Sequence, residues 1–185
     1  NCARTTRRLY RSHLRGFLRY LYNERNILTH NLADLFVGPP MFAKARPPKF
    51  LRPHELSRLF NHLPHSTGCE LRTYAMVHLA FFLGLRPSEI SRITLDDISF
   101  AKAQLTLRNR KNSRPLQLPI PESTLKAITA YIVGARPKVE HRALFVLLVA
   151  PYKPISSGLV GQYLTWALRN AGIDATAYCL RHTYA

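Results

Sequence analysis

Five prolines within fifteen residues constrain the fold of this 185-residue chain more than any other feature. The stretch VGPPMFAKARPPKFLRPHEL contains Pro39, Pro40, Pro47, Pro48 and Pro53. Proline fixes φ and lacks a backbone N–H, so prolines this close together exclude a continuous helix or strand. Residues 39–53 are therefore predicted to form an extended, semi-rigid linker. This linker separates an N-terminal piece, residues 1–38, from a larger domain, residues 54–185.

The N-terminal piece is predicted to contain a helix between Arg4 and Arg25 that carries two stripes. One stripe is apolar and is expected to face a core: Tyr10, Leu14, Phe17, Leu18 and Leu21. The other repeats arginine at the same helical spacing: Arg4, Arg8, Arg11, Arg15 and Arg19. A short helix at 32–36 follows, and two helices are too few to bury a core of their own. The piece is therefore interpreted as part of a larger helical domain.

The net charge indicates the class of partner. The chain has 27 Lys and Arg against 10 Asp and Glu, a formal net charge of +17, and a pI near 10.5. Such a surplus favours a polyanion. An arginine stripe without interspersed carboxylates repels itself unless phosphates neutralise it, so double-stranded DNA is the expected partner. The alternatives are a solvated charged face and a basic helix that lies on lipid.

Composition argues against several other classes of protein. The longest apolar stretches, residues 75–85 and 143–152, are too short to cross a bilayer, and the N-terminus lacks the apolar region of an export signal. Cys2, Cys69 and Cys179 form no CxxC pair, which fits a reducing compartment and argues against structural zinc. A cytoplasmic protein without a membrane segment or structural zinc is expected.

The larger domain is predicted to be mainly α with a small antiparallel sheet, an α+β fold. Helical patterns lie at residues 53–63, 70–83, 122–133 and 158–170. Gly84, Gly134 and Gly172 follow three of these patterns, as expected at helix ends. Period-two alternation predicts three short strands, around residues 98–100, 105–107 and 116–120. The run ALFVLLVA, between the last two helices, is expected to be buried.

Two basic residues of this domain are singled out by their positions, and only the first suits phosphate binding by itself. In GLRPSEI, Pro87 suits the first position of a helix and Glu89 the third, which places Arg86 at the N-cap. The helix N-terminus favours an anion there, and a guanidinium adds bidentate reach to a phosphate. Lys111 lies in the turn between the second and third strands, where a lysine is most often an ordinary soluble turn residue.

Three motifs, in this order, resemble the motif boxes of the tyrosine recombinases, the phage-integrase family: LGLRPSEISRITLDDI, RKNSRPLQLPIP and YCLRHTYA. The N-terminal piece resembles the last helices of that family's core-binding domain, and residues 54–185 resemble its catalytic domain. The resemblance implies a two-domain clamp around duplex DNA. It also implies a tyrosine that attacks the scissile phosphate, giving a 3′-phosphotyrosyl link and a free 5′-hydroxyl without metal or cofactor.

The resemblance also implies a role for each matching residue. Arg86 and Arg181 would hold the non-bridging phosphate oxygens as charge develops in the transition state. Lys111 would protonate the leaving 5′-oxygen as general acid, while Arg110 and Arg114 beside it would bind DNA. Glu89 would brace the Arg86 loop. His182 is interpreted as a residue that positions its loop, in preference to a direct role in proton transfer.

The sequence departs from the family pattern in three places. Tyr178 stands where the family has a histidine, and because a phenol keeps its proton at neutral pH, we expect it to donate a hydrogen bond to phosphate. The box that supplies a further His or Trp and the nucleophilic tyrosine is missing, and Tyr184 lies too close to Arg181 to replace it. The first helices of the core-binding domain are also missing. We therefore expect truncation at both ends, with the nucleophile beyond residue 185.

Three hypotheses about function follow. The favoured one is a segment of an active site-specific DNA recombinase, because Arg86, Lys111 and Arg181 are all present. The second is an inactive relative that binds DNA and occupies recombination sites. The third is an enzyme like the type IB topoisomerases, against which the brevity of the chain argues. The resemblance implies a homotetramer on DNA for the full-length protein, and this chain alone is expected to be a monomer.

Overall fold

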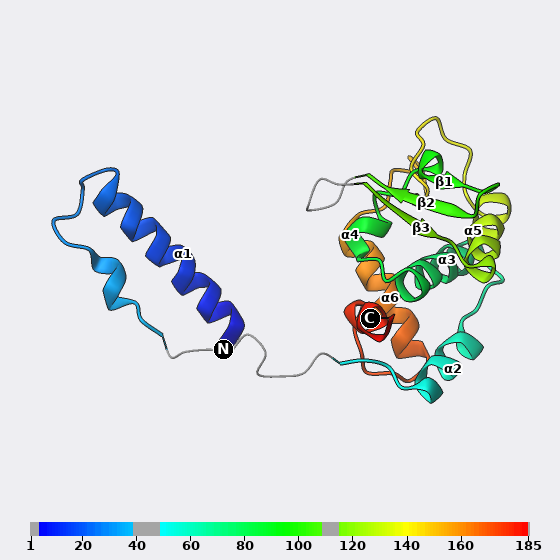
Figure 1. The fold of residues 1–185 in the computed structure, drawn as a ribbon, viewed down its shortest axis with the longest axis horizontal. Coiled ribbons are helices and arrows are strands. Elements are labelled where there is room, and N and C mark those ends of the chain that lie inside the picture. Colours follow the sequence, from blue (N-terminus) through cyan, green and yellow to red (C-terminus); the bar gives the residue numbers. More distant parts are fainter. Residues whose placement is uncertain (1–3, 39–48, 109–114, 185) are drawn as a thin grey trace. The chain divides into compact units, whose positions relative to one another are not determined.

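The computed structural model describes residues 4–38, 49–108 and 115–184. Two compact units divide the chain: Asn1–Pro47, the N-terminal unit, and Pro48–Ala185, the C-terminal unit (Figure 1). Among the described residues, no helix is long and apolar enough to cross a membrane.

In the N-terminal unit, the described residues 4–38 contain a long helix and a short 3-10 turn. Helix α1 (Arg4–Asn23) packs against η1 (Leu32–Leu35), which Asn31 caps by accepting the Ala33 N–H at 3.1 Å. The expectation of a buried apolar stripe is wrong for Tyr10, Leu14 and Phe17, whose exposed fractions are 63%, 40% and 57%. A four-residue turn is too short to cover a twenty-residue helix, so most of this face remains accessible to solvent.

The C-terminal unit is built around a central apolar helix, α3 (Gly68–Phe82), which packs against α4, α5, α6 and α7. Thr67 caps α3 by accepting the Glu70 N–H at 3.4 Å. Eight of its fifteen residues are buried. The surrounding helices are α2 (Pro53–His62), α4 (Pro87–Ile90), α5 (Glu122–Gly134), α6 (Ser157–Asn170) and α7 (Ala177–Tyr184). Gly84 and Gly172, with φ of 61° and 68°, turn the chain after α3 and α6, as their positions in the sequence predict.

A small sheet lies at one edge of this unit. The turn η2 (Leu95–Asp97) leads into β1 (Ile98–Ser99), β2 (Gln104–Leu107) and β3 (Leu116–Pro119), which pair antiparallel in the order β1-β2-β3. Ile98 pairs with Leu105, and Leu105 pairs with Leu118. The predicted α+β fold class is therefore confirmed for the described residues (Figure 1).

The segment between α5 and α6 is only partly buried. Leu144, Phe145 and Val146 are buried, whereas Val149 is 76% exposed, so the expectation of burial along ALFVLLVA is wrong at its C-terminal end. Arg136 holds this segment by donating to the carbonyl oxygens of Pro137, His141, Ala143 and Leu144 at 2.8–3.4 Å. Backbone hydrogen bonds also hold it, since the Leu144 N–H donates to the Ile93 carbonyl at 2.8 Å and the Leu147 N–H donates to the Lys153 carbonyl at 2.9 Å.

Candidate functional site

Arg86 stands at the start of α4, where its own helix fixes it. Pro87 occupies the first helical turn, and the Arg86 backbone N–H donates to Oε2 of Glu89 at 2.8 Å. The other carboxylate oxygen, Oε1, accepts a hydrogen bond from Nη1 of Arg86 at 3.1 Å. Glu89 therefore holds both the backbone and the guanidinium of Arg86.

Arg181 reaches the same carboxylate from α7. Its Nη1 donates to the carbonyl oxygen of Gly84 at 2.7 Å, across 97 residues of sequence, and lies 3.6 Å from Oε2 of Glu89. The Glu89 side chain is 9% exposed, while those of Arg86 and Arg181 are 47% and 31% exposed. One buried carboxylate thus joins two guanidiniums that solvent still reaches, and an anion can approach both.

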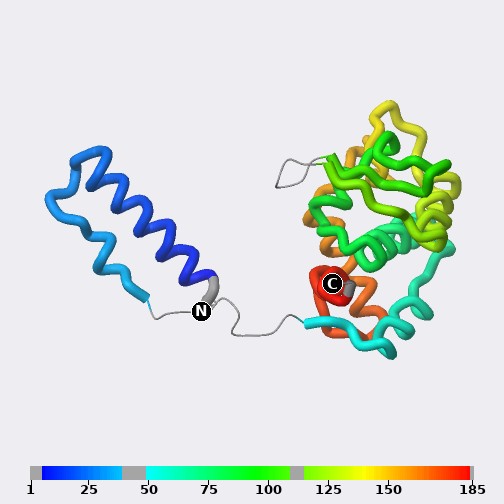
Figure 2. The backbone as a smooth tube through the Cα atoms, viewed as in Figure 1, coloured from blue at the N-terminus to red at the C-terminus, as the bar shows by residue number. Residues whose placement is uncertain are grey.

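Helix α7 is anchored by its apolar side and by one hydroxyl. Ala177, Cys179 and Leu180 are buried. The hydroxyl of Thr183 accepts the Leu51 N–H at 2.8 Å and donates to the Cys179 carbonyl at 2.7 Å. Figure 2 shows the start of this unit, in cyan, passing beside α7, in red. Arg181 is therefore held from both sides of its helix.

Tyr178 and His182, the other predicted residues of α7, are both exposed. Tyr178 lines a groove of about 630 Å³ together with Pro87 and Ser88 from the start of α4 and Trp166 from α6. The phenol therefore lies along a groove whose lining includes the two residues that follow Arg86 in the sequence.

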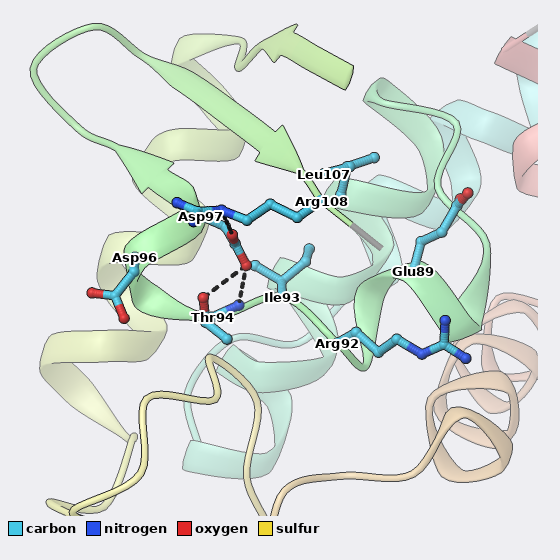
Figure 3. Close-up of a pocket in the computed structure, with 8 residues that line it drawn as sticks. All are labelled: Glu89, Arg92, Ile93, Thr94, Asp96, Asp97, Leu107 and Arg108. Atoms are coloured by element: carbon cyan, nitrogen blue, oxygen red, sulfur yellow. Dashed lines mark hydrogen bonds and ion pairs between the residues drawn. The ribbon is translucent and has the colours of Figure 1, made fainter. Parts of the chain in front are cut away.

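A smaller pocket of about 220 Å³ also borders Glu89 (Figure 3). In it, Asp97 accepts the Thr94 N–H at 2.9 Å and the Thr94 hydroxyl at 2.7 Å, and it pairs with Nε of Arg108 at 3.1 Å. Asp96 points away from this cluster in Figure 3. The hydrogen bond from Arg142 holds the pKa of Asp96 below its ordinary value. The Asp97–Arg108 pair thus fixes the end of β2.

The structure describes only some of the other predicted site residues. Lys111, Arg110 and Arg114 lie outside the described residues, as does the side chain of Arg4. On α1, Arg8, Arg11 and Arg19 are exposed and Arg15 is half-buried. Among the side chains that the structure describes, no cluster of three His, Cys, Asp or Glu residues could hold a metal ion.

Sequence reasoning missed three groups that shape this site: the Gly84 carbonyl, Thr183 and Asp97. The T-x-x-D spacing of Thr94 and Asp97 was a local signal for the last of these, because it is typical of a capping box. Thr183 carried no such signal, since its partner Leu51 is 132 residues away in the sequence.

Comparison with known proteins gives one consistent result. The profile of the phage integrase family matches residues 49–185. An integrase/recombinase of Sinorhizobium fredii is 30% identical over 97% of this chain and 43% of its own length. Tyrosine recombinase XerC of Caldanaerobacter subterraneus subsp. tengcongensis is 32% identical over 93% of this chain and 48% of its own. The chain thus spans less than half the length of these two relatives.

The fold agrees with that of solved recombinases. The XerH site-specific recombinase, in a post-cleavage complex with a palindromic difH substrate, superimposes with a TM-score of 0.74 at 15% identity, over 95% of this chain and 53% of that one. At this identity the likeness concerns the fold alone. Together with the profile match, it identifies the chain as a member of the phage integrase family, the tyrosine recombinases.

Proposed function

We propose that this chain is part of a site-specific recombinase that cleaves and rejoins DNA through a phosphotyrosine intermediate. The observation that carries the proposal is the joining of Arg86 and Arg181 by the buried carboxylate of Glu89. Two guanidiniums with a common brace are suited to hold the non-bridging oxygens of one phosphodiester. Family membership supports the same chemistry.

The proposed reaction needs no energy source, because one phosphodiester replaces another. A tyrosine located beyond residue 185 loses its phenolic proton to solvent water, and its oxygen attacks phosphorus while the bond from phosphorus to the 5′-oxygen breaks. Lys111 gives a proton to that oxygen, which leaves as a hydroxyl. Arg86 and Arg181 stabilise the pentacoordinate transition state, and Tyr178 donates a hydrogen bond to a phosphate oxygen. Glu89 and His182 position the arginines without touching the reacting atoms.

Double-stranded DNA is the proposed partner. The net charge of +17 and the exposed arginines of α1 favour a polyanion, and the XerH neighbour is bound to a palindromic difH substrate. We further propose that the full-length protein assembles as a homotetramer on DNA, whereas residues 1–185 alone form a monomer. Sedimentation of the full-length protein and of residues 1–185, each with and without duplex, distinguishes these states.

Trapping of the covalent intermediate tests the central proposal. The probe is a nicked duplex that carries the site selected by the full-length protein from a random-sequence pool. We expect the full-length protein to form a covalent adduct on a denaturing gel, and residues 1–185 to form none. An adduct of residues 1–185 that disappears in Tyr184→Phe would place the nucleophile at Tyr184 instead.

A change of the leaving group distinguishes a general-acid role of Lys111 from simple phosphate binding. In the full-length protein, Lys111→Ala should slow cleavage by about a hundred- to ten-thousand-fold. A substrate with sulfur at the 5′-bridging position should restore the rate, because a thiolate leaves without a proton. Rescue of the matched variant Arg110→Ala, or no rescue of Lys111→Ala, would assign the acid elsewhere.

One observation favours a second function. Tyr178 occupies the position at which the resemblance places a histidine, and a lost catalytic residue is expected in a relative that only occupies recombination sites. Binding of the selected site by the full-length protein without any adduct would support this inactive relative. Relaxation of supercoiled DNA without regard to sequence would instead support an enzyme like the type IB topoisomerases.

A further inference from the structure

The hydroxyl of Thr183 ties the first residues of the C-terminal unit to the helix that carries Arg181. It accepts the backbone N–H of Leu51 at 2.8 Å and donates to the Cys179 carbonyl at 2.7 Å. We define residues 49–52 as the leading segment. Because the donor and an acceptor position of the hydroxyl are both used, its orientation is set by two partners.

Both ends of this hydrogen bond are firmly held. Leu51 is 4% exposed and belongs to the core, and the next N–H, that of Arg52, donates to Oε2 of Glu55 at 2.8 Å at the start of α2. On the other side, Cys179 and Leu180 are 5% and 0% exposed. The bond therefore joins two packed elements, so its loss changes how they fit together.

The geometry of α7 connects this bond to the candidate site. Thr183 and Arg181 are two positions apart on a helix, which places them on opposite faces. Thr183 contacts the leading segment, while Arg181 contacts Gly84 and Glu89. A rotation or shift of α7 that follows loss of the Leu51 bond therefore moves the guanidinium away from its 2.7 Å contact with Gly84.

We propose that Thr183 is a positioning residue for Arg181, with the leading segment as its anchor. This inference rests on the proposed function, because DNA cleavage is the reaction for which Arg181 would be positioned. A misplacement of about 1 Å can cost about a hundred-fold in rate, whereas one displaced guanidinium removes little of an affinity to which many phosphates contribute. Loss of the hydroxyl should consequently lower the cleavage rate far more than DNA affinity.

Two substitutions and one control separate positioning from stability. Thr183→Val keeps the shape and loses the hydroxyl, and Thr183→Ser keeps the hydroxyl. Thr73→Val is the matched control, because the Thr73 hydroxyl also donates to a carbonyl four residues earlier, that of Cys69 at 2.9 Å, but in α3. The probe is the nicked duplex described above, used in single-turnover cleavage and in equilibrium binding with full-length protein.

We expect Thr183→Val to slow cleavage about ten- to a hundred-fold while its DNA affinity stays within about two-fold of wild type. Thr183→Ser should recover most of the rate, and Thr73→Val should cleave like wild type. An unchanged rate in Thr183→Val overturns the proposal, and so does an equal slowing in Thr73→Val, since that indicates general destabilisation.

A measurement without DNA keeps the inference independent of the proposed reaction. Amide hydrogen exchange should become faster in α7 and at Leu51 in Thr183→Val, with α3 unchanged. If wild type forms no adduct, the proposed function fails, whereas exchange still tests the tie between α7 and the leading segment. Equal protection of α7 in wild type and Thr183→Val overturns that tie, whatever the reaction is.

Discussion

At the scale of single residues, Glu89 has the largest consequences for the candidate site. Its carboxylate contacts Arg86 and lies 3.6 Å from Arg181, and its exposure is 9%. Removing the charge of a buried group between two guanidiniums leaves them without a common anion and allows them to separate. The position of the phosphate would then be less well defined.

The variant Glu89→Gln tests this effect, since it keeps the size of the side chain and removes its charge. We expect DNA cleavage by the full-length protein to slow about ten- to a hundred-fold, with DNA affinity unchanged or slightly higher. The control is Glu122→Gln, which removes an exposed carboxylate paired with Lys126 outside the site. Equal rates for Glu89→Gln and wild type would show that the brace is dispensable.

A second residue gives the fold a dependence on pH. His78 is 3% exposed, its ring contacts those of Phe60, Tyr74 and Phe82, and neither ring nitrogen has a hydrogen-bond partner among the described residues. Burial lowers its pKa from 6.5 to about 4. Between these values the unfolded chain binds a proton that the folded chain does not, so stability falls as the pH falls.

Chemical denaturation at pH 7 and pH 4 measures this contribution. Relative to His78→Leu, wild type should lose about 3 kcal/mol of unfolding free energy between the two values, and most of the loss should occur below pH 6.5. Carboxylates also titrate in this range, so the difference between the two proteins is the informative quantity. His62→Gln, at an exposed histidine of α2, should follow wild type; parallel curves for His78→Leu and wild type would contradict the assignment.

At the scale of elements, local patterns predicted the positions of the helices and strands well. They predicted poorly which residues of different elements contact one another. Proline at the start of α4 and glycines after α3 and α6 act within a few residues, so sequence alone locates those boundaries. The pairing of Leu51 with Thr183 depends on tertiary packing, which no local pattern encodes. For the same reason, Arg86 and Arg181 could be paired from the sequence only through the family resemblance. The contact between Arg181 and the Gly84 carbonyl was missed.

The apolar stripe of α1 illustrates a different error, because burial was predicted for residues that are exposed in the structure. Its spacing correctly predicted an amphipathic helix, but periodicity says nothing about whether a partner is present to cover the apolar face. Tyr10 and Phe17 are more than half exposed for this reason. The run ALFVLLVA failed similarly at its C-terminal end, because composition does not show where a segment leaves the core, and Val149 is 76% exposed.

Arg136 holds the start of the segment between α5 and α6, which forms only isolated β-bridges. Its guanidinium donates to four carbonyls between Pro137 and Leu144, so Arg136→Leu leaves several backbone acceptors without partners. We expect a loss of about 3 kcal/mol in unfolding free energy, measured by urea denaturation. The matched control is Arg142→Leu in the same segment, which removes only an exposed ion pair with Asp96 and should shift the midpoint little. Similar midpoints for the two variants would contradict this role.

At the scale of the whole molecule, charge and chain length dominate. The surplus of cations is a property of the full sequence, and α1 presents its exposed arginines beside an uncovered apolar face. The chain spans less than half the length of the two relatives that we compared, so binding studies of residues 1–185 measure only the contacts available to this part.

Salt dependence of DNA binding tests the arginine stripe. Replacing Arg8, Arg11 and Arg15 together by glutamine should reduce the slope of log affinity against log salt by about three, if each contacts one phosphate. The control replaces Lys126 and Arg142, which are paired with Glu122 and Asp96 in the C-terminal unit, and should leave the slope nearly unchanged. An unaltered slope in the triple variant would indicate that the stripe faces solvent.

The tie between Leu51 and Thr183 also sets an order of events during protein synthesis. The two residues are 132 positions apart, and at about 5–20 residues per second a ribosome makes the second roughly 7 to 26 seconds after the first. Arg86 and Glu89 are three residues apart and can meet early, whereas Arg181 arrives with α7. A nascent chain therefore carries half of the two-arginine site for several seconds, and the same helix then completes that site and secures the leading segment.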